Sequence, residues 1–208
     1  MKRIVLSILF VAVGLFVSAQ TQLSETQSQE IMASLTETAA SMQTMQCRFI
    51  QSKTMAMLAE PSVSEGRMYF SAPDRLRWEY LTPYPFTLVV NGERIVKVTD
   101  GKSEVLEGNS GRMYQGIVGM IMGSASGKKM FDTSTFDVVL YDDGAFWKAE
   151  MTPKRRDMKR MFSQLVFYFD KKSQVVDHVE FNGVGGDVTE IRFVEVRVNA
   201  EIEEEKFQ

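Results

Sequence analysis

Residues 66–92 read GRMYFSAPDRLRWEYLTPYPFTLVVNG and contain three short runs in which apolar and polar side chains alternate. Successive side chains of a strand point to opposite faces of a sheet, so apolar residues at every second position share one face. The apolar positions are Met68, Phe70, Leu76, Trp78, Tyr80, Phe86, Leu88 and Val90, whereas Arg67, Arg75, Arg77 and Glu79 fall on the other face. The stretch therefore predicts a sheet with one solvated face and one apolar face, which packs a core or encloses a cavity.

The rest of the chain predicts one helix and further strands. A helix is expected over Ser24 to Gln46, capped by Ser24 or Ser28, because apolar residues recur there at helical spacing. Its apolar stripe is Ile31, Leu35, Ala39 and Met42. Strands are expected at 47–53, 93–99, 137–141, 146–151, 161–169, 175–182 and 188–198, with hairpin turns at 91–92, 100–101 and 142–144. About ten antiparallel strands with short connections indicate an α+β fold with a strongly curved sheet or an incomplete barrel.

Residues 110–127 interrupt the strands with a glycine-rich segment. Met113, Ile117, Met120 and Ile121 lie on one helical stripe of it. Each interior glycine costs a helix about 1 kcal/mol relative to alanine, so a helix here is expected to be short and easily displaced. The segment is interpreted either as a mobile apolar lid or plug over the sheet, or as an ordinary loop helix that completes the core.

Residues 1–19 have the pattern of a cleaved secretory signal peptide. Lys2 and Arg3 precede an apolar run from Ile4 to Val17, and Val17-Ser18-Ala19 forms a small-residue cleavage site. An uncleaved membrane anchor is the alternative, but the run is shorter than the roughly 20 residues that span a bilayer. Residues 20–208 are therefore expected to form a single domain in the periplasm. No cysteine follows the apolar run, which argues against a lipid-anchored protein.

The charge and the single cysteine exclude some classes of function. Without residues 1–19 the chain has 27 acidic residues against 22 lysines and arginines, because Lys2 and Arg3 are lost. This balance gives no general reason to expect nucleic-acid binding. Cys47 cannot form an internal disulfide, and a small buried hydrophobe is favoured over a reactive thiol at that position.

An enzyme is the first rival to a binding protein. The only histidine, His178, lies in an alternating strand where a surface position is expected. No nucleophile elbow, HExxH motif or paired-cysteine metal pattern occurs in the sequence. A non-enzymatic protein without cofactor or metal is therefore expected.

Several motifs occur along residues 24–207 in an order typical of one family. They are Phe49-Ile50-Gln51, the stretch from Gly66 to Trp78 with its Pro73, Pro83 with Val90-Asn91-Gly92, Met151-Thr152-Pro153-Lys154, and Thr189 to Phe193. In this order and spacing the sequence resembles the LolA family of periplasmic carriers of outer-membrane lipoproteins. The resemblance implies an open antiparallel half-barrel of about 10–11 strands, with helices over a hydrophobic cavity that takes acyl chains. It also implies that the protein shuttles lipoproteins from the inner to the outer membrane.

The resemblance directs attention to particular positions. Trp78 matches the family's cavity tryptophan, and Ala72 stands where the family has an arginine associated with hydrogen bonds of the lid, which makes position 72 the expected gating position. The expected lining of the cavity is Leu35, Phe49, Met68, Phe70, Leu76, Trp78, Tyr80, Leu88, Val90, Met113, Ile117, Met120, Ile121, Val138, Leu140, Leu165 and Phe167. Adaptable methionines suit such a lining, with Met32, Met42 and Met45 as further candidates, although they equally suit an irregular core.

The implied partners are lipoprotein acyl chains or another lipid, the inner-membrane ABC transporter that releases lipoproteins, and an outer-membrane receptor lipoprotein. A monomer is expected. Lys154, Arg155, Arg156, Lys159 and Arg160 form the one basic cluster, which is either a docking patch for an acidic partner or a solvated hairpin. A periplasmic lipid binder or envelope sensor of the same fold, with different cargo, remains the alternative function.

Overall fold

The computed structural model describes residues 20–55, 57, 58, 60–107 and 131–208. The expected signal peptide lies outside the described residues. The same holds for the glycine-rich segment 110–127 with Met113, Ile117, Met120 and Ile121.

Twelve strands and two α-helices make up the described fold, and a short 3-10 helix ends it. The strands are β1 (Thr21–Gln22), β2 (Thr44–Thr54), β3 (Ser62–Ser71), β4 (Arg75–Thr82), β5 (Phe86–Asn91), β6 (Arg94–Thr99), β7 (Lys102–Val105), β8 (Phe136–Asp143), β9 (Phe146–Pro153), β10 (Phe162–Asp170), β11 (Val176–Gly183) and β12 (Val188–Val198). The helices are α1 (Glu25–Ser41), α3 (Arg156–Lys159) and the 3-10 helix η1 (Glu204–Phe207).

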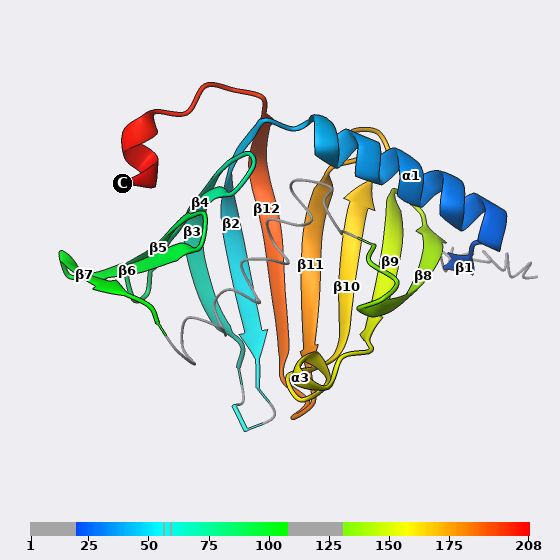
Figure 1. The fold of residues 1–208 in the computed structure, drawn as a ribbon. Coiled ribbons are helices and arrows are strands. Elements are labelled where there is room, and N and C mark those ends of the chain that lie inside the picture. The colour runs from blue at the N-terminus through cyan, green and yellow to red at the C-terminus, as the bar shows by residue number, and fades with distance from the viewer. Residues whose placement is uncertain (1–19, 56, 59, 108–130) are drawn as a thin grey trace, which may run out of the picture.

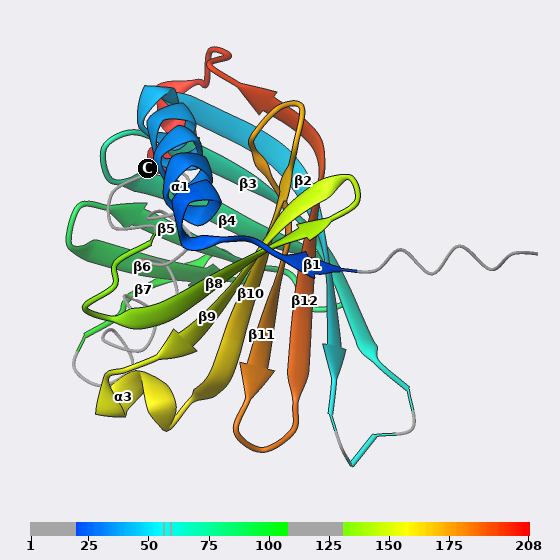
Figure 2. The same ribbon diagram turned by 90° about the vertical axis from the view of Figure 1, so that its right-hand side faces the viewer.

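All twelve strands belong to one antiparallel sheet in the order β1-β8-β9-β10-β11-β12-β2-β3-β4-β5-β6-β7. Two runs of consecutive hairpins, β2 to β7 and β8 to β12, join where β12 pairs with β2 from Thr54 to Met45. The sheet is strongly curved, and its two edges, β1 and β7, do not pair with each other (Figures 1 and 2). The predicted incomplete barrel is therefore confirmed.

Two strands were not predicted. β1 contains only Thr21 and Gln22, and β7 from Lys102 to Val105 is exposed along its whole length. Neither has an apolar face, because both lie at an edge of the sheet. Short or charged strands are typical of such edges. Alternating hydrophobicity is consequently a weak signal for them.

Helix α1 begins as predicted and ends earlier than predicted. Ser24 caps it in a capping box with Gln27: the backbone N–H of each residue donates to the side chain of the other. The helix ends at Ser41 rather than Gln46, and β2 starts at Thr44 rather than Cys47. The reason is that Met45 is fully buried in the sheet opposite Phe70, a tertiary contact that local periodicity does not reveal.

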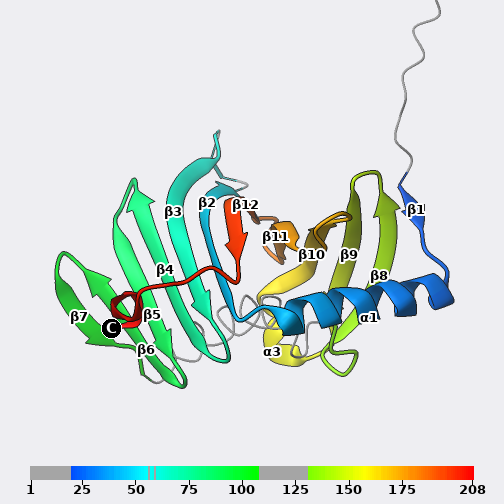
Figure 3. The same ribbon diagram turned by 90° about the horizontal axis from the view of Figure 1, so that it is seen from above.

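Helix α1 lies across the ends of β8 to β11 and on the concave side of the sheet (Figures 1 and 3). Its buried residues Leu35 and Ala39 join one continuous hydrophobic cluster with residues from β2 to β6 and from β8 to β12. We call the side of the sheet that carries this cluster the inner face, and the opposite side the outer face. No helix among the described residues is long and apolar enough to cross a bilayer.

The outer face is largely charged, and the end of the chain lies on part of it. Helix η1 lies against β4 and β5, where Arg75 pairs with Glu204 and its guanidinium stands 4.8 Å from the ring centre of Phe207. Phe207 is 4% exposed. Val89 and Val96, which are opposite each other on β5 and β6, are buried although they lie outside the inner-face cluster. The end of the chain thus forms a second, smaller apolar contact on the outer face.

Candidate functional site

An aromatic wall lies on the inner face of β2, β4 and β5. Phe49 and Trp78 are stacked with ring centres 4.3 Å apart, and Tyr80 meets the edge of Phe49 at 5.2 Å. Tyr80 in turn stacks on Phe86 at 4.5 Å, while Phe193 from β12 meets Trp78 edge-on at 6.3 Å. Five aromatic rings from four strands therefore form one continuous apolar surface.

The register of the strands explains why these rings meet. Phe49 is paired with Gly66 on β3, and Gly66 is paired with Tyr80 on β4. Because glycine has no side chain, the rings of Phe49 and its neighbours can cross over β3 at this point. The Gly66 position is thus part of the site even though it contributes no side chain to it.

Two polar groups interrupt the aromatic wall. The hydroxyl of Tyr80 donates to Oε1 of Gln51 at 2.9 Å. Nε1 of Trp78 is also buried, yet among the described residues it has no hydrogen-bond acceptor. Buried polar groups are nearly always hydrogen-bonded, so an orphaned indole N–H on an apolar face is unusual.

The predicted lining residues within the described chain all belong to the inner face. Leu35, Phe49, Met68, Phe70, Leu76, Trp78, Leu88, Val90, Leu140, Leu165 and Phe167 are members of the hydrophobic cluster, and Tyr80 and Val138 pack against it. Met42 and Met45 are members as well, and Met32 packs against them from α1. The structure thus brings the predicted residues together. Residues that the prediction omitted, such as Phe181, Ile191 and Phe193, alternate on the same face of β11 and β12.

A hollow of about 280 Å³ opens where β11 and β12 diverge. Pairing of these strands stops at His178 and Arg192, and the remainder of β12 pairs only with β2. The hollow is lined by Asp170, Ser173, Val175, Val176, Asp177, Phe193, Val196 and Val198. Through Val176 and Phe193 it borders the hydrophobic cluster of the inner face.

The turn beside this hollow holds α1 to the sheet. Oε1 of Gln174 accepts hydrogen bonds from the hydroxyls of Ser34 and Thr38, each at 2.8 Å. The turn itself is fixed by Asp170, whose Oδ1 accepts from the backbone N–H and the hydroxyl of Ser173. These hydrogen bonds hold the pKa of the Asp170 carboxyl below its ordinary value. One side-chain oxygen therefore links the helix to the sheet, a contact for which the sequence carries no local signal.

Ala72 lies just after β3 and packs against the inner-face cluster. Its backbone N–H donates to the carbonyl oxygen of Gln43, in the connection between α1 and β2, at 2.8 Å. Its methyl side chain can form no hydrogen bond. Position 72 thus links the β3–β4 turn to the connection that follows α1 through the backbone alone.

The basic cluster occupies the connection between β9 and β10, where α3 forms a single turn. Lys154 pairs with Asp137 on β8, and Arg155 pairs with its neighbour Asp157. Arg156, Lys159 and Arg160 are exposed and have no ion pair within the described part of the chain. Three cations of this cluster are therefore available to solvent.

His178 is buried, and the expectation of a surface position was wrong. It lies on the outer face, but its ring is stacked on Tyr168 at 3.9 Å and covered edge-on by Phe146 at 5.5 Å. Burial, followed by the nearby Glu180 carboxylate, raises the pKa of Tyr168, which therefore stays a neutral phenol. Periodicity placed the histidine on the correct face but could not show that two aromatic rings cover it.

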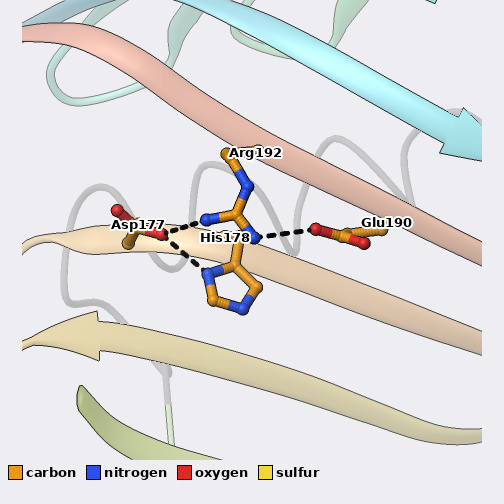
Figure 4. A network of polar contacts seen from close by, with 4 residues as sticks. All are labelled: Asp177, His178, Glu190 and Arg192. Carbon is orange, nitrogen blue, oxygen red and sulfur yellow. Dashed lines mark hydrogen bonds and ion pairs between the residues drawn. The ribbon is translucent and has the colours of Figure 1, made fainter. Parts of the chain in front are cut away.

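Figure 4 shows that the polar groups around His178 are satisfied by one another. Nδ1 of His178 lies 2.7 Å from Oδ2 of Asp177, which also accepts from Arg192 at 3.0 Å. Arg192 completes the network by donating to Glu190. The arrangement is that of a structural cross-strand network on the outer face. Across the described residues, no three histidine, cysteine, aspartate or glutamate side chains gather as a metal site.

Cys47 is a small buried hydrophobe, as predicted. Its side chain is 7% exposed within the inner-face cluster, opposite Met68 on β3. Burial raises the pKa of the Cys47 thiol to about 12. The thiol is therefore neutral and unreactive in the folded protein at physiological pH.

Comparison with known proteins matches most of the described chain to a family. Residues 40–208 match the family model described as "Outer membrane lipoprotein carrier protein LolA". The chain belongs to the LolA family. The match covers every strand from β2 onward, including both halves of the inner face. Carriers of this family are binding proteins, so the LolA assignment is in keeping with the absence of an enzyme motif from the sequence.

The individual proteins to which the chain is similar are distant in sequence. The chain is similar to an outer-membrane lipoprotein carrier protein of Methylobacillus flagellatus, with 26% identity over 165 residues, 79% of this chain and 77% of the relative. The fold resembles an uncharacterized conserved protein from Thermus thermophilus, with a TM-score of 0.54, 13% identity and coverage of 88% and 93%. It also resembles a chain in the complex of Pseudomonas aeruginosa MucA and MucB, with a TM-score of 0.50, 12% identity and coverage of 88% and 60%.

Proposed function

We propose that this protein is a periplasmic carrier that holds the acyl chains of lipoproteins against the inner face and moves them from the inner to the outer membrane. The observation that carries the proposal is the inner face itself. It is a continuous apolar surface that runs across both halves of an unclosed sheet. Membership in the LolA family supports lipoprotein as the cargo.

The open sheet suits a ligand that must enter and leave. Each methylene moved from water to an apolar site favours binding by about 0.8 kcal/mol, so a cargo with several acyl chains would be held almost irreversibly by a rigid pocket. Here the inner-face side chains pack on one another, and bound chains would replace contacts that the protein already makes. The free energy gained on binding is thereby reduced to a level that permits release.

Helix α1 is the element that we propose to move when cargo binds. It covers part of the inner face with Leu35 and Ala39 and is held to the sheet by the oxygen of Gln174. Position 72 carries no side chain that could lock such a helix, so we propose that closure relies on apolar contacts. Ala72→Arg is then expected to slow cargo release, which can be timed by transfer of a labelled lipopeptide to acceptor vesicles.

We further propose that Arg156, Lys159 and Arg160 dock on an acidic surface of the inner-membrane ABC transporter that delivers the cargo. Opposite charges across an interface raise the rate of association more than they raise affinity. Replacing the three cations with glutamine is expected to slow loading at low salt and to leave acyl-chain binding unchanged. Equal loading rates for the variant and the original protein would contradict docking by this patch.

Binding of a fluorescent fatty acid tests the site directly, and the chain offers a matched pair of variants. Phe86 lies on the inner face against Tyr80, whereas Phe146 lies on the outer face against His178, and both are half-buried. Phe86→Ala is expected to weaken binding of the probe by about tenfold, since burial of one aromatic contact is lost. Phe146→Ala is expected to bind the probe normally. An equal loss of affinity for the probe in both variants would contradict a binding site on the inner face.

The identity of the bound lipid separates the carrier from a lipid binder of the same fold. Protein purified from the periplasm is expected to contain lipoprotein when analysed by native mass spectrometry. Phospholipid without lipoprotein would instead favour a lipid-binding or sensing role.

A further inference from the structure

The indole N–H of Trp78 is the feature of the inner face that packing does not explain. Trp78 is 3% exposed and is enclosed by Phe49, Tyr80 and Phe193. Its Nε1 is shielded from solvent and has no acceptor among the described residues. A phenylalanine would bury a similar apolar ring at this place without leaving a donor unsatisfied.

The neighbouring aromatic residue shows how the protein satisfies a polar tip on the same face. The hydroxyl of Tyr80 donates to Oε1 of Gln51, whose side chain projects from β2 onto the inner face beside Phe49. Trp78 has no such partner on Met68 or Leu88, the residues paired with it on β3 and β5. A donor that the fold leaves unpaired within an apolar binding face is suited to an acceptor brought by a ligand.

We propose that Nε1–H of Trp78 is the polar anchor of the acyl-chain site and donates a hydrogen bond to the carbonyl oxygen of a bound acyl ester or amide. The inference rests on the proposed function and adds to it the chemical class of the ligand group that the site recognises. Hydrocarbon chains offer no acceptor, but each chain attached through an ester or an amide carries one carbonyl oxygen. The anchor therefore fixes the depth of the chain by its carbonyl end.

A pair of ligands that differ only in that carbonyl tests the anchor. Dodecyl glyceryl ether and glyceryl monolaurate have the same chain length and headgroup, and only the laurate ester has a carbonyl oxygen. One hydrogen bond to a donor that is already desolvated is worth roughly tenfold in affinity. The protein is expected to prefer the ester by roughly this factor.

Two variants test whether the preference for the ester over the ether depends on Trp78. Trp78→Phe keeps an aromatic ring against Phe49 but removes the N–H, so it is expected to bind the two ligands with equal affinity and the ether as tightly as the original protein does. Trp147→Phe is the matched control, because Trp147 also packs against the inner-face cluster but lies on β9, separated from β4 by five strands of the sheet. It is expected to retain the preference for the ester. Retention of the preference by Trp78→Phe would overturn the proposal.

Nuclear magnetic resonance gives a readout that does not depend on any variant being folded. The chain has two tryptophans, so ¹⁵N-labelled protein gives two indole N–H signals. The Trp78 proton is expected to shift downfield with the ester and to stay in place with the ether, while the Trp147 proton is expected not to distinguish the ester from the ether. An unmoved Trp78 signal with bound ester would overturn the anchor and leave the acyl-chain site intact. Failure of both ligands to bind would remove the site and the anchor together.

Two further ligands test whether the bound carbonyl belongs to a lipoprotein or to a glycerolipid. A synthetic peptide with an N-acylated, diacylglyceryl-modified cysteine carries the amide and esters of a lipoprotein, and dipalmitoylglycerol carries esters alone. If the Trp78 signal shifts at a lower concentration of the peptide than of the glyceride, the result supports a lipoprotein carbonyl. The reverse order supports a glycerolipid as the anchored ligand.

Discussion

Phe49 and Gly66 face each other on β2 and β3, and the ring of Phe49 covers the glycine so closely that a Cβ at position 66 would lie 2.3 Å from Cζ of the ring. The same Cβ would lie 1.9 Å from the carbonyl oxygen of Glu79 on β4. Gly66 is therefore required by the approach of both neighbours. It allows Phe49 to reach Trp78 across β3 and complete the aromatic wall.

Gly66→Ala is expected to destabilise the protein by about 3 kcal/mol, because neither the ring nor the backbone oxygen can move away without disturbing the sheet. Urea denaturation measures the change. Gly185→Ala is the control, since a Cβ there meets nothing within 4 Å. Replacing Phe49 with leucine in the Gly66→Ala background should restore little stability, because the contact with the Glu79 oxygen remains. Full recovery would show that the ring alone requires the glycine.

Cutting the link between α1 and Gln174 is expected to loosen the helix. Gln174→Ala removes both hydrogen bonds and should destabilise the docked helix by about 2 kcal/mol. Gln174 has a φ of +57°, so Gln174→Gly removes the same bonds but relieves the backbone, and its loss should be smaller. Hydrogen exchange of the α1 amides should accelerate in both variants, with exchange in β2 to β6 unchanged. Unchanged α1 exchange would show that apolar contacts alone hold the helix.

The end of the chain is expected to stabilise the outer face. Phe207→Ala should lower the free energy of unfolding by about 2–3 kcal/mol, because the ring is buried and lies beneath the Arg75 guanidinium. Tyr84→Ala, at an aromatic residue that is 82% exposed, serves as the control and should change stability by less than about 0.5 kcal/mol. Thermal unfolding of each variant gives a melting temperature, and the two melting temperatures are compared. Equal melting temperatures would mean that η1 does not contribute to stability.

Burial of the Cys47 thiol predicts a dependence of stability on alkaline pH. The folded-state pKa of about 12 exceeds the ordinary thiol value of 9.0, so the folded protein holds the thiol proton more tightly than the unfolded chain does. The resulting stabilisation is complete below about pH 9 and is lost as pH rises toward 12. The stability difference between the protein and Cys47→Ala should therefore narrow over this window. A constant difference would indicate a thiol that reaches solvent.

The sequence predicts the strand faces on which apolar residues alternate. It does not predict contacts that depend on a single tertiary partner. Alternation correctly placed Leu76 and Trp78 on the inner face, because most residues of a buried strand face are apolar. It missed β1 and β7, which bury no face, and it extended α1 into β2, since only the pairing of Met45 with Phe70 marks the start of that strand.

The sequence also did not predict two polar features of the inner face and its helix. The double hydrogen bond at Gln174 joins residues 136 and 140 positions apart in the sequence. The orphaned N–H of Trp78 likewise emerges only when its neighbours on β3 and β5 are known to be apolar. Local pattern therefore predicted which side chains share the inner face, whereas tertiary structure was needed to find the buried N–H that we propose as a polar anchor and the hydrogen bonds that hold α1 to the sheet.

Removal of lipoproteins from the inner membrane into solution is the central activity that we propose for this protein. The most direct measurement is incubation of the purified protein with spheroplasts that synthesise radiolabelled lipoproteins, followed by separation of membranes from the soluble fraction. We expect labelled lipoprotein in the soluble fraction in complex with the protein, and less of it with Phe86→Ala than with Phe146→Ala. Lipoprotein that stays entirely with the membranes in the presence of the folded protein would contradict the carrier function.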